Sequence, residues 1–330
     1  MTKNKSSVSR PINLGIIGCG IAARELHLPA LVALKDHFKI TAVCNHTRPK
    51  ALSFSRLVGG VPYVLDYREL LANPEVEAVD IALPIHLNYP AAVDSIKAGK
   101  HVFMEKPLAA NLKDAKKLLA LERPKGPVTM IAENFRYQTL VRRVANHLAL
   151  GTIGRPYAAI WDVFSHVTTE NKYARTTWRI RHKYPGGFLT DGGVHHVAAL
   201  RLIFGELTVM DSFVKSVNRG IGRQDTLSAR WRNGDGVDIQ LNLFFSATGH
   251  DENRWLIFGT KGTLEVKENR ILLQRSGQVS SQEVIRDDGG FKAEFMDFFD
   301  AVRRHRRPLS TFVEGYHDLK TILGALEAAK

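Results

Sequence analysis

Cysteine is scarce in this chain, in which Cys19 and Cys44 are the only two among 330 residues. They do not form a pair with the spacing of metal ligands, so the sequence argues against a disulfide framework and against a zinc site. We therefore expect no bound metal. Cys19 lies within a glycine-containing turn, where we expect a bulky adduct on its thiol to block a ligand of that turn.

Long apolar runs are also missing. No segment approaches the roughly 18 consecutive apolar residues of a membrane-spanning helix. Residues 1–10 are polar and lack the apolar core of a signal peptide. We therefore expect a cytoplasmic protein without a membrane partner, and a disordered tail over residues 1–10.

Acidic residues are fewer than basic ones. The chain has 33 Asp and Glu against 46 Lys and Arg, which gives a formal net charge of +13. A basic balance is the first sign of phosphate binding. The excess is spread through both halves, however, and no motif interleaves basic with aromatic residues. The one dense run, residues 303–307, ends an expected helix before Pro308, where cations are favourable. We favour a solvated helix end over binding of anionic metabolites or nucleic acid, and expect no nucleic-acid partner.

The amino-terminal half alternates apolar strands with helices, which predicts a doubly wound parallel sheet of the Rossmann type. Its expected strands begin at residue 12 and continue at 38–44, 78–83, 101–104 and 128–132. One expected helix follows the first strand. The others cover residues 49–58, 66–71, 89–98 and 111–121. A turn-rich break at 122–127 predicts a dinucleotide-binding domain over residues 11–126 and a second domain over residues 127–330.

The second half has a different texture, because long strands follow one another without regular intervening helices. The expected strands are 157–164, 209–217, 226–231, 237–245, 255–258, 263–266 and 271–274. The expected helices are 139–150, 191–204, 291–306 and 313–329. Consecutive strands joined by turns indicate a large, mostly antiparallel open sheet. The predicted fold class is therefore α/β, with an N-terminal Rossmann sheet and a C-terminal α+β domain.

The glycine turn near the start is the first candidate for ligand binding. An apolar strand ends in Gly18-x-Gly20-x-x-Ala23 and passes into a helix. In a dinucleotide-binding unit Gly18 permits the turn, Gly20 lets a pyrophosphate approach the backbone, and Ala23 lets the helix pack on the strand. The alternative is a tight turn without a ligand, since any such turn favours glycine.

The residues after the second expected strand bear on the choice of cofactor. An NAD site usually has Asp or Glu there to accept from the ribose hydroxyls, whereas an NADP site has small polar and cationic groups. Here the sequence reads Cys44-Asn45-His46-Thr47-Arg48, without a carboxylate. We favour NADP over NAD, because Arg48 can pair with a 2′-phosphate. The alternative is that Arg48 merely opens the next helix.

Two further motifs carry groups suited to proton transfer. Glu105-Lys106-Pro107 follows a strand, at the sheet edge where ligands of open α/β sheets bind. Asp191 and His195 are four residues apart and share one face of an expected helix, and a carboxylate beside an imidazole suits general acid–base chemistry. The alternatives are a surface lysine, and a capping aspartate with a core histidine.

Together these motifs, with His27-Leu28-Pro29-Ala30-Leu31 after the glycine turn, resemble the glucose-fructose oxidoreductase / inositol dehydrogenase / rhizopine catabolism (Gfo/Idh/MocA) family. The resemblance implies an NAD(P)-dependent oxidoreductase acting on a sugar, cyclitol or related diol. It implies that Lys106 contacts the reacting hydroxyl, that His195 is the acid–base, and that Asp191 orients His195. It also implies that the sheet of the second domain contributes to substrate binding. Copies of the chain are expected to assemble through this sheet into a homo-oligomer, a dimer or tetramer.

The resemblance extends to residues lining the expected sites. The expected cofactor-binding residues are Gly18, Gly20, Ile21, Ala22, Ala23, Asn45, Thr47, Arg48, Leu83, Pro84, Asn88, Glu105 and Lys106. The expected substrate-binding residues are Arg136, Tyr137, Trp178, Arg179, Asp191 and His195. Two positions depart from the family pattern, since Asn88 stands where many members have His and Ala198 where many have Asp.

The expected reaction is hydride transfer between the nicotinamide and a carbinol or carbonyl carbon, with the hydroxyl proton exchanged with His195. Lys106 is expected to stabilise charge on the same oxygen. The alternative is a non-catalytic regulator that senses a dinucleotide or a sugar on the same fold. The presence of Lys106, Asp191 and His195 favours the enzyme, because a sensor does not need a proton-transfer set.

Overall fold

The computed structural model describes residues 10–123 and 125–329, so the expected tail lies outside the described residues except for Arg10. The chain divides into two compact units, each discontinuous in sequence. The first comprises the described residues up to Glu105, then Lys117–Ala132 and Phe291–Phe312. The second comprises Lys106–Lys116, Glu133–Gly290 and the described residues from Val313 onward.

The first unit contains a six-stranded sheet in the order β3-β2-β1-β4-β5-β6, and every neighbouring pair is parallel. Its strands are β1 (Ile12–Ile17), β2 (Phe38–Cys44), β3 (Tyr63–Val64), β4 (Ala78–Ile81), β5 (His101–Glu105) and β6 (Thr129–Ala132). The central strands are apolar and buried, as is typical of parallel strands covered on both faces. This arrangement confirms the expected Rossmann-type sheet.

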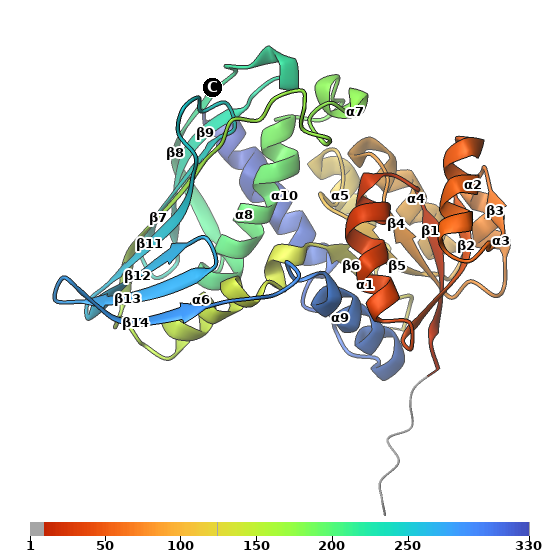
Figure 1. Ribbon diagram of the computed structural model, residues 1–330, viewed down its shortest axis with the longest axis horizontal. Helices are drawn as coiled ribbons and strands as arrows, with labels where there is room; N and C mark the ends of the chain where they lie inside the picture. Colours follow the sequence, from red (N-terminus) through yellow and green to blue (C-terminus); the bar gives the residue numbers. More distant parts are fainter. Residues whose placement is uncertain (1–9, 124, 330) are drawn as a thin grey trace, which may run out of the picture. The chain divides into compact units, whose positions relative to one another are not determined.

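Helices cover both faces of this sheet (Figure 1). They are a π-helical turn η1 (Ala23–His27), α1 (Leu28–Ala33), α2 (Arg48–Leu57), α3 (Tyr67–Ala72), α4 (Ile85–Lys97) and α9 (Phe291–Arg304). Helix α5 (Leu112–Leu119) contains residues of both units. Asp66 caps α3, because its side chain accepts a hydrogen bond from the Arg68 amide at 2.9 Å. Helix α4 begins one turn before its expected start, directly after Pro84.

Helix α9 belongs to the first unit although it lies late in the sequence. The ring of Phe295 on α9 stacks on Phe103 of β5, with centroids 4.4 Å apart, and meets Phe38 of β2 edge to face. Phe295 and Phe103 are both fully buried. The last third of the chain therefore supplies part of the core of the parallel sheet.

The second unit contains an eight-stranded sheet in the order β14-β13-β12-β11-β7-β10-β9-β8. Its strands are β7 (Pro156–Phe164), β8 (Leu207–Lys215), β9 (Thr226–Asn233), β10 (Asp238–Phe244), β11 (Glu252–Gly259), β12 (Gly262–Lys267), β13 (Arg270–Arg275) and β14 (Gln278–Val284). Neighbours are antiparallel except β7 and β10. This arrangement confirms the large, mostly antiparallel sheet expected for the second half of the chain.

The second unit's helices are η2 (Asn134–Arg136), α6 (Thr139–Ala149), α7 (Thr177–Ile180), α8 (Phe188–Phe204), η3 (Arg219–Ile221) and α10 (Phe312–Ala328). Helices α8 and α10 lie along one face of the eight-stranded sheet (Figure 1). Alternate residues of β10, such as Ile239, Leu241 and Leu243, are fully buried, while the residues between them are half-buried. The sheet thus has one covered and one open face.

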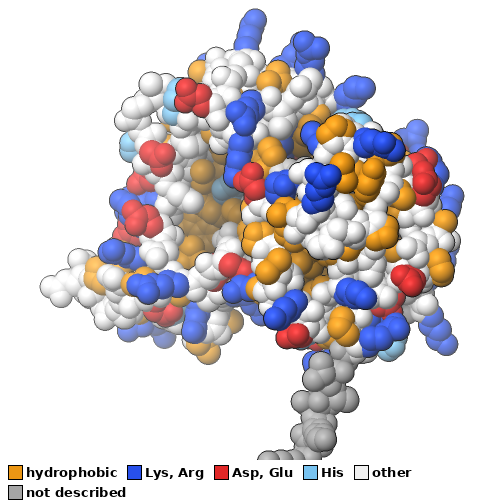
Figure 2. All heavy atoms as spheres, turned by 45° about the vertical axis from the view of Figure 1, so that its right-hand side comes forward, with side chains coloured by type: hydrophobic (Ala, Val, Ile, Leu, Met, Phe, Trp, Pro, Cys, Tyr) orange, Lys and Arg blue, Asp and Glu red, His pale blue; other side chains and the backbone are white. Residues whose placement is uncertain are grey.

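None of the described helices is long and apolar enough to cross a membrane. On the face drawn in Figure 2, Lys and Arg side chains are scattered among acidic and hydrophobic ones rather than gathered into one large patch. This distribution matches the spread of basic residues along the sequence.

Candidate functional site

The glycine turn joins β1 to the first helical segment and leaves room beside its backbone. Gly18 has a φ of +103°, and a Cβ there would lie 2.4 Å from the Ala82 carbonyl oxygen. A Cβ on Gly20 would meet no atom within 4 Å. The first glycine is therefore required by the fold, whereas the second faces open space. An open backbone at the start of a helix is what a dinucleotide pyrophosphate requires.

The turn is tied to the end of β2 by Asn45, whose side-chain oxygen accepts from the Cys19 amide at 3.3 Å. The Cys19 side chain, in contrast, is 3% exposed and its thiol contacts the Cys44 carbonyl oxygen. Burial raises the pKa of the Cys19 thiol to about 12. The thiol therefore points into the protein, and the expectation that a bulky adduct on it blocks a ligand of the turn stays a prediction.

Arg48 is the first residue of α2 and is exposed. Thr47 precedes it as the N-cap residue, and the Thr47 carbonyl oxygen accepts from the Asn45 side chain at 3.3 Å. The structure shows no ion pair of Arg48 with any described residue. Its guanidinium is thus available to an anion at the end of β2.

Asn88 lies on α4 and is fully buried. Its side-chain amide donates to the Glu105 carbonyl oxygen at 2.9 Å. Leu83 and Pro84, which immediately precede α4, follow β4 and lie next to the glycine turn, since Leu83 is 3.1 Å from the position of a Cβ on Gly18. These cofactor-site candidates therefore surround the turn and the end of β5.

The first unit also contains a buried cluster of ionisable side chains, which the sequence did not indicate. His27, which is 0% exposed, lies with Nδ1 2.8 Å from Asp80 Oδ2 and Nε2 3.1 Å from Glu105 Oε1. Burial opposes the charge of His27, but the two carboxylates overcome it and raise its pKa well above the ordinary value. The histidine is therefore a cation buried between two acids, which links the first helical segment to β4 and β5.

In the second unit, Lys106 and Arg179 converge on Asp191. The Lys106 Nζ donates to the Asp191 carbonyl oxygen at 2.6 Å and to its Oδ1 at 2.9 Å. The Arg179 Nε donates to Asp191 Oδ2 at 2.6 Å. The Arg179 guanidinium also lies over the Trp178 ring, 4.0 Å from its centroid. Three of the expected site residues are thus joined in one polar cluster.

The charge of Asp191 is fixed by this cluster. Burial alone would raise the pKa of its carboxyl group, but the charges and hydrogen bonds of Lys106 and Arg179 hold that pKa well below its usual range. Asp191 is therefore ionised at any pH at which the protein works, and it does not itself exchange protons.

His195 lies one turn further along α8 and has a different carboxylate partner. Its Nδ1 is 2.6 Å from Glu133 Oε1, and the ring of Phe135 stacks on the imidazole with centroids 4.8 Å apart. This corrects the expectation that Asp191 orients His195, because the carboxylate of Asp191 is bonded to Lys106 and Arg179 instead. Glu133 is buried, and it lies three residues before the expected site residue Arg136.

Besides Asp191, two of the expected substrate-binding residues are buried. Arg136 is 2% exposed, and its guanidinium is bonded to Asp318 of α10 at 2.6 and 2.8 Å. Asp318 also accepts from Arg201 of α8 at 2.5 Å. Arg136 therefore holds η2, α8 and α10 together, and we leave it out of the proposed substrate site. Tyr137 is likewise buried.

A parallel sheet with an open glycine turn, and a second unit bearing a lysine, a carboxylate and a histidine, indicate a two-domain nicotinamide-dependent oxidoreductase. Two family models match the chain, "Oxidoreductase family, NAD-binding Rossmann fold" over residues 12–133 and "GFO/IDH/MocA C-terminal domain" over residues 141–265. The chain belongs to the Gfo/Idh/MocA family of NAD(P)-dependent oxidoreductases.

Two curated relatives span nearly the whole chain. The uncharacterised protein YMR315W of Saccharomyces cerevisiae is 31% identical over 91% of this chain and 90% of its own length. The 1,5-anhydro-D-fructose reductase of Ensifer adhaerens is 27% identical over 96% of this chain and 95% of its own length. Named relatives of this chain thus include a sugar reductase.

Solved structures share the fold. An oxidoreductase from Thermotoga maritima has a TM-score of 0.92 at 36% identity, covering 97% of both chains. WlbA dehydrogenase from Bordetella pertussis, in complex with NADH and UDP-GlcNAcA, has a TM-score of 0.85 at 23% identity, covering 97% and 96%. KijD10, a 3-ketoreductase from Actinomadura kijaniata in complex with NADP and TDP-benzene, has a TM-score of 0.84 at 24% identity, covering 96% and 98%.

Proposed function

We propose that this chain catalyses hydride transfer between NADP and a carbinol or carbonyl carbon of a sugar, cyclitol or related diol. The nicotinamide, when bound, supplies or accepts the hydride. The observation that carries the proposal is the arrangement on α8, where Asp191 binds Lys106 and Arg179 and, one turn on, His195 binds Glu133. The reductase among the relatives, which is named for 1,5-anhydro-D-fructose, supports a sugar-type substrate.

The residues of the glycine turn fit a dinucleotide. The open backbone at Gly20 and the helix that starts beyond it are suited to the pyrophosphate. Asn45, Thr47 and Arg48 are proposed to meet the adenosine end, with Arg48 on a 2′-phosphate. NADP remains our choice over NAD because no carboxylate stands at this position and because the exposed guanidinium attracts phosphate.

Lys106 is proposed to hydrogen-bond the reacting oxygen of the substrate. An ammonium group held by Asp191 is already oriented, so it stabilises negative charge that develops on this oxygen without reorganising. Asp191 is a positioning residue in this scheme, because it holds Lys106 and Arg179 and stays ionised. Arg179 and Trp178 are proposed to bind the substrate beyond the reacting carbon.

His195 is proposed to take the hydroxyl proton when the substrate is oxidised and to return a proton when a carbonyl is reduced. The carboxylate of Glu133 at Nδ1 fixes the tautomer, so that Nε2 is the atom that exchanges the proton. The same carboxylate stabilises the imidazolium that forms during oxidation. Glu133 therefore has the orienting role that the sequence suggested for Asp191.

The assembly and location of the protein are also part of the proposal. The open face of the eight-stranded sheet carries half-buried apolar residues, including Ile160, Phe244 and Leu256, which supports a homo-oligomer formed through this face. We propose a cytoplasmic protein, as its composition suggests.

The experiment that tests the proposed function is a spectrophotometric assay of NADPH and NADH oxidation, and of NADP⁺ and NAD⁺ reduction. The panel contains sugars, cyclitols, dihydrodiols and dicarbonyl compounds. The proposal predicts saturable turnover with at least one polyhydroxy compound. Tight binding of the cofactor without turnover on any member would favour a sensor instead.

A further inference from the structure

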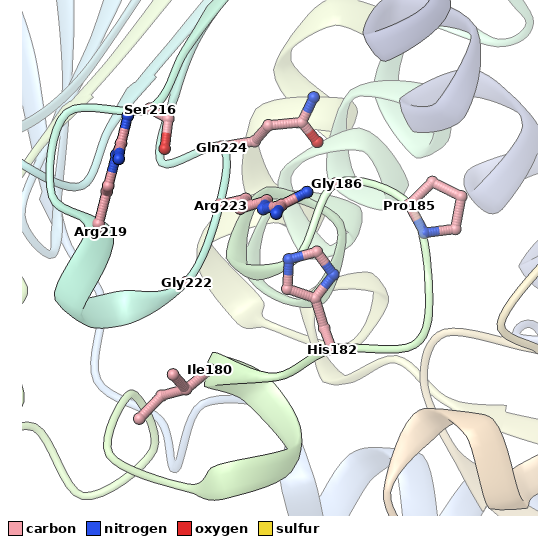
Figure 3. Close-up of a pocket in the computed structure, with 9 residues that line it drawn as sticks. All are labelled: Ile180, His182, Pro185, Gly186, Ser216, Arg219, Gly222, Arg223 and Gln224. Atoms are coloured by element: carbon pink, nitrogen blue, oxygen red, sulfur yellow. The ribbon is translucent and has the colours of Figure 1, made fainter.

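A pocket of about 670 Å³ lies in the second unit, apart from the lysine and histidine of the proposed site. It is lined by residues of the segments 180–186 and 216–224 (Figure 3). Figure 3 shows Arg219 on one side of the pocket and Arg223 with His182 on another. The volume is in the range of pockets that bind small organic ligands.

The lining of this pocket is strongly basic. It includes the guanidinium groups of Arg219 and Arg223 and the imidazole of His182, together with the polar side chains of Ser216 and Gln224, but no Asp or Glu. Among the described residues, the structure shows no carboxylate partner for either arginine. Two cations without counter-ions in one concave site favour binding of an anion.

The loop that carries the two arginines is held in place by a buried carboxylate. Asp225 accepts hydrogen bonds from the Val217 amide at 3.0 Å, from the Asn218 amide at 2.6 Å and from the Ser246 hydroxyl at 2.6 Å. Asn218 in turn donates to the Val167 carbonyl oxygen. Asp225 therefore fixes the loop without lining the pocket, and the arginines project from an ordered support.

One of the two lining segments, residues 180–186, directly follows the proposed substrate residues Trp178 and Arg179 in the chain. Ile180 lines the pocket and directly follows Arg179, which binds Asp191. His182 donates through Nδ1 to the Tyr184 carbonyl oxygen at 2.7 Å, which leaves Nε2 for a ligand. The ring of Tyr184 lies with its centroid 6.2 Å from that of Trp178, so this tyrosine is close to the ionic cluster.

We propose that this pocket binds the phosphate of a phosphorylated substrate, with Arg219 and Arg223 as the principal ligands and His182 in support. The inference rests on the proposed function, because it assigns the substrate to sugar derivatives that carry a phosphate or diphosphate group. Guanidinium groups bind phosphate oxygens in a bidentate manner, and such charge-assisted hydrogen bonds are among the stronger ones in proteins.

Calorimetric titration with inorganic pyrophosphate tests the pocket directly. The protein is first saturated with NADPH, so that the cofactor site does not contribute. Wild-type protein is expected to bind, and the double variant R219Q/R223Q to bind at least about tenfold more weakly, since each lost charged hydrogen bond is worth about tenfold or more. The matched control R286Q/R307Q removes two exposed arginines elsewhere and is expected to bind as the wild type does.

Absence of pyrophosphate binding to the wild type would overturn the inference, as would equal binding by R219Q/R223Q. Separate titrations with glucose 6-phosphate and uridine diphosphate distinguish a sugar phosphate from a nucleotide-linked sugar as the source of the phosphate. Binding of a short RNA oligonucleotide in place of these probes would also contradict the proposal.

Kinetics separate this inference from the proposed function. Sugars are compared in pairs with and without a phosphate, and R219Q/R223Q is expected to lower the phosphorylated-to-unphosphorylated ratio of kcat/KM about tenfold or more. The control R286Q/R307Q is expected to keep the ratio of the wild type. If no compound is turned over, the proposed function fails while calorimetry still decides the pocket. An unchanged ratio in R219Q/R223Q would contradict the pocket alone.

Discussion

Glu133 Oε1 lies 2.6 Å from His195 Nδ1, and Glu133 is buried while the imidazole remains partly accessible. Phe135, two residues after Glu133, stacks on the same imidazole. One short segment therefore sets both the tautomer and the plane of the ring. This pairing gives His195 an orienting carboxylate that is separate from the one that holds Lys106.

Replacing Glu133 with Gln is predicted to lower turnover about 10- to 100-fold, the size of effect seen when an orienting partner is lost. The loss should fall on kcat rather than on the KM of the substrate, because Glu133 acts through His195 and does not itself bind the substrate in the proposed scheme. Steady-state kinetics, with the exposed Glu170→Gln as control, measure both parameters. An unchanged kcat would show that Glu133 is only structural.

Replacing Arg48 with Ala is predicted to weaken binding of NADP about tenfold and to change binding of NAD little. The exposed guanidinium has no ion-pair partner among the described residues, so its removal should affect mainly the 2′-phosphate contact. Fluorescence titration of NADPH and NADH measures both affinities, with the exposed Arg56→Ala of the same helix as control. Equal losses for the two cofactors would argue against the preference for NADP.

Replacing Asp191 with Asn is predicted to destabilise the protein at pH 7 by about 3 kcal/mol, because Lys106 and Arg179 lose a buried counter-ion. The pKa of Asp191 is lowered in the folded protein, so its stabilising contribution is present above its ordinary value of 3.8 and is lost as the pH falls further. Urea unfolding from pH 7 down to pH 4 should therefore show a constant difference from the wild type.

Asp238, whose side chain is 40% exposed and pairs with Arg232, provides the control for this measurement, and Asp238→Asn should leave the free energy of unfolding almost unchanged. If Asp191→Asn is equally harmless, Asp191 does not carry a buried charge.

Replacing His27 with Gln is predicted to destabilise the protein most at low pH. Its pKa is raised in the folded protein, so the contribution is complete below the ordinary value of 6.5 and is lost as the pH rises through the folded value. The difference in free energy of unfolding from the wild type should be about 2 kcal/mol or more at pH 6 and should shrink above pH 6.5. The exposed His46→Gln is the control. A difference that grows with pH would contradict a buried cation at His27.

The sequence predicted the regular elements well where local pattern and burial agree. The expected strand 38–44 is β2, and the expected helix 313–329 is α10 within one residue at each end. Strand β14 was not predicted, because Gln278–Val284 is polar and mostly exposed at the sheet edge. The parallel pairing of β7 with β10 was also not predictable, because it joins strands far apart in the chain.

The candidate site was predicted by residue type but not by pairing. Helical spacing placed Asp191 and His195 on one face of α8, and the structure confirms that helix. The spacing could not show that the carboxylate bonded to His195 is that of Glu133, more than fifty residues earlier. Nor could it show that Arg179 binds Asp191. Local sequence also contains no sign that Arg136 is neutralised by Asp318 near the other end of the chain.

The most direct test of the account is the effect of His195→Ala on turnover, measured on the best substrate of the panel. Loss of a general acid–base should lower kcat about 10²- to 10⁴-fold while the Kd of NADPH, measured by fluorescence, changes less than about twofold. Lys106→Ala should lower kcat by a similar factor, and the exposed His46→Ala should have no effect. Full turnover by His195→Ala would contradict the proposed mechanism.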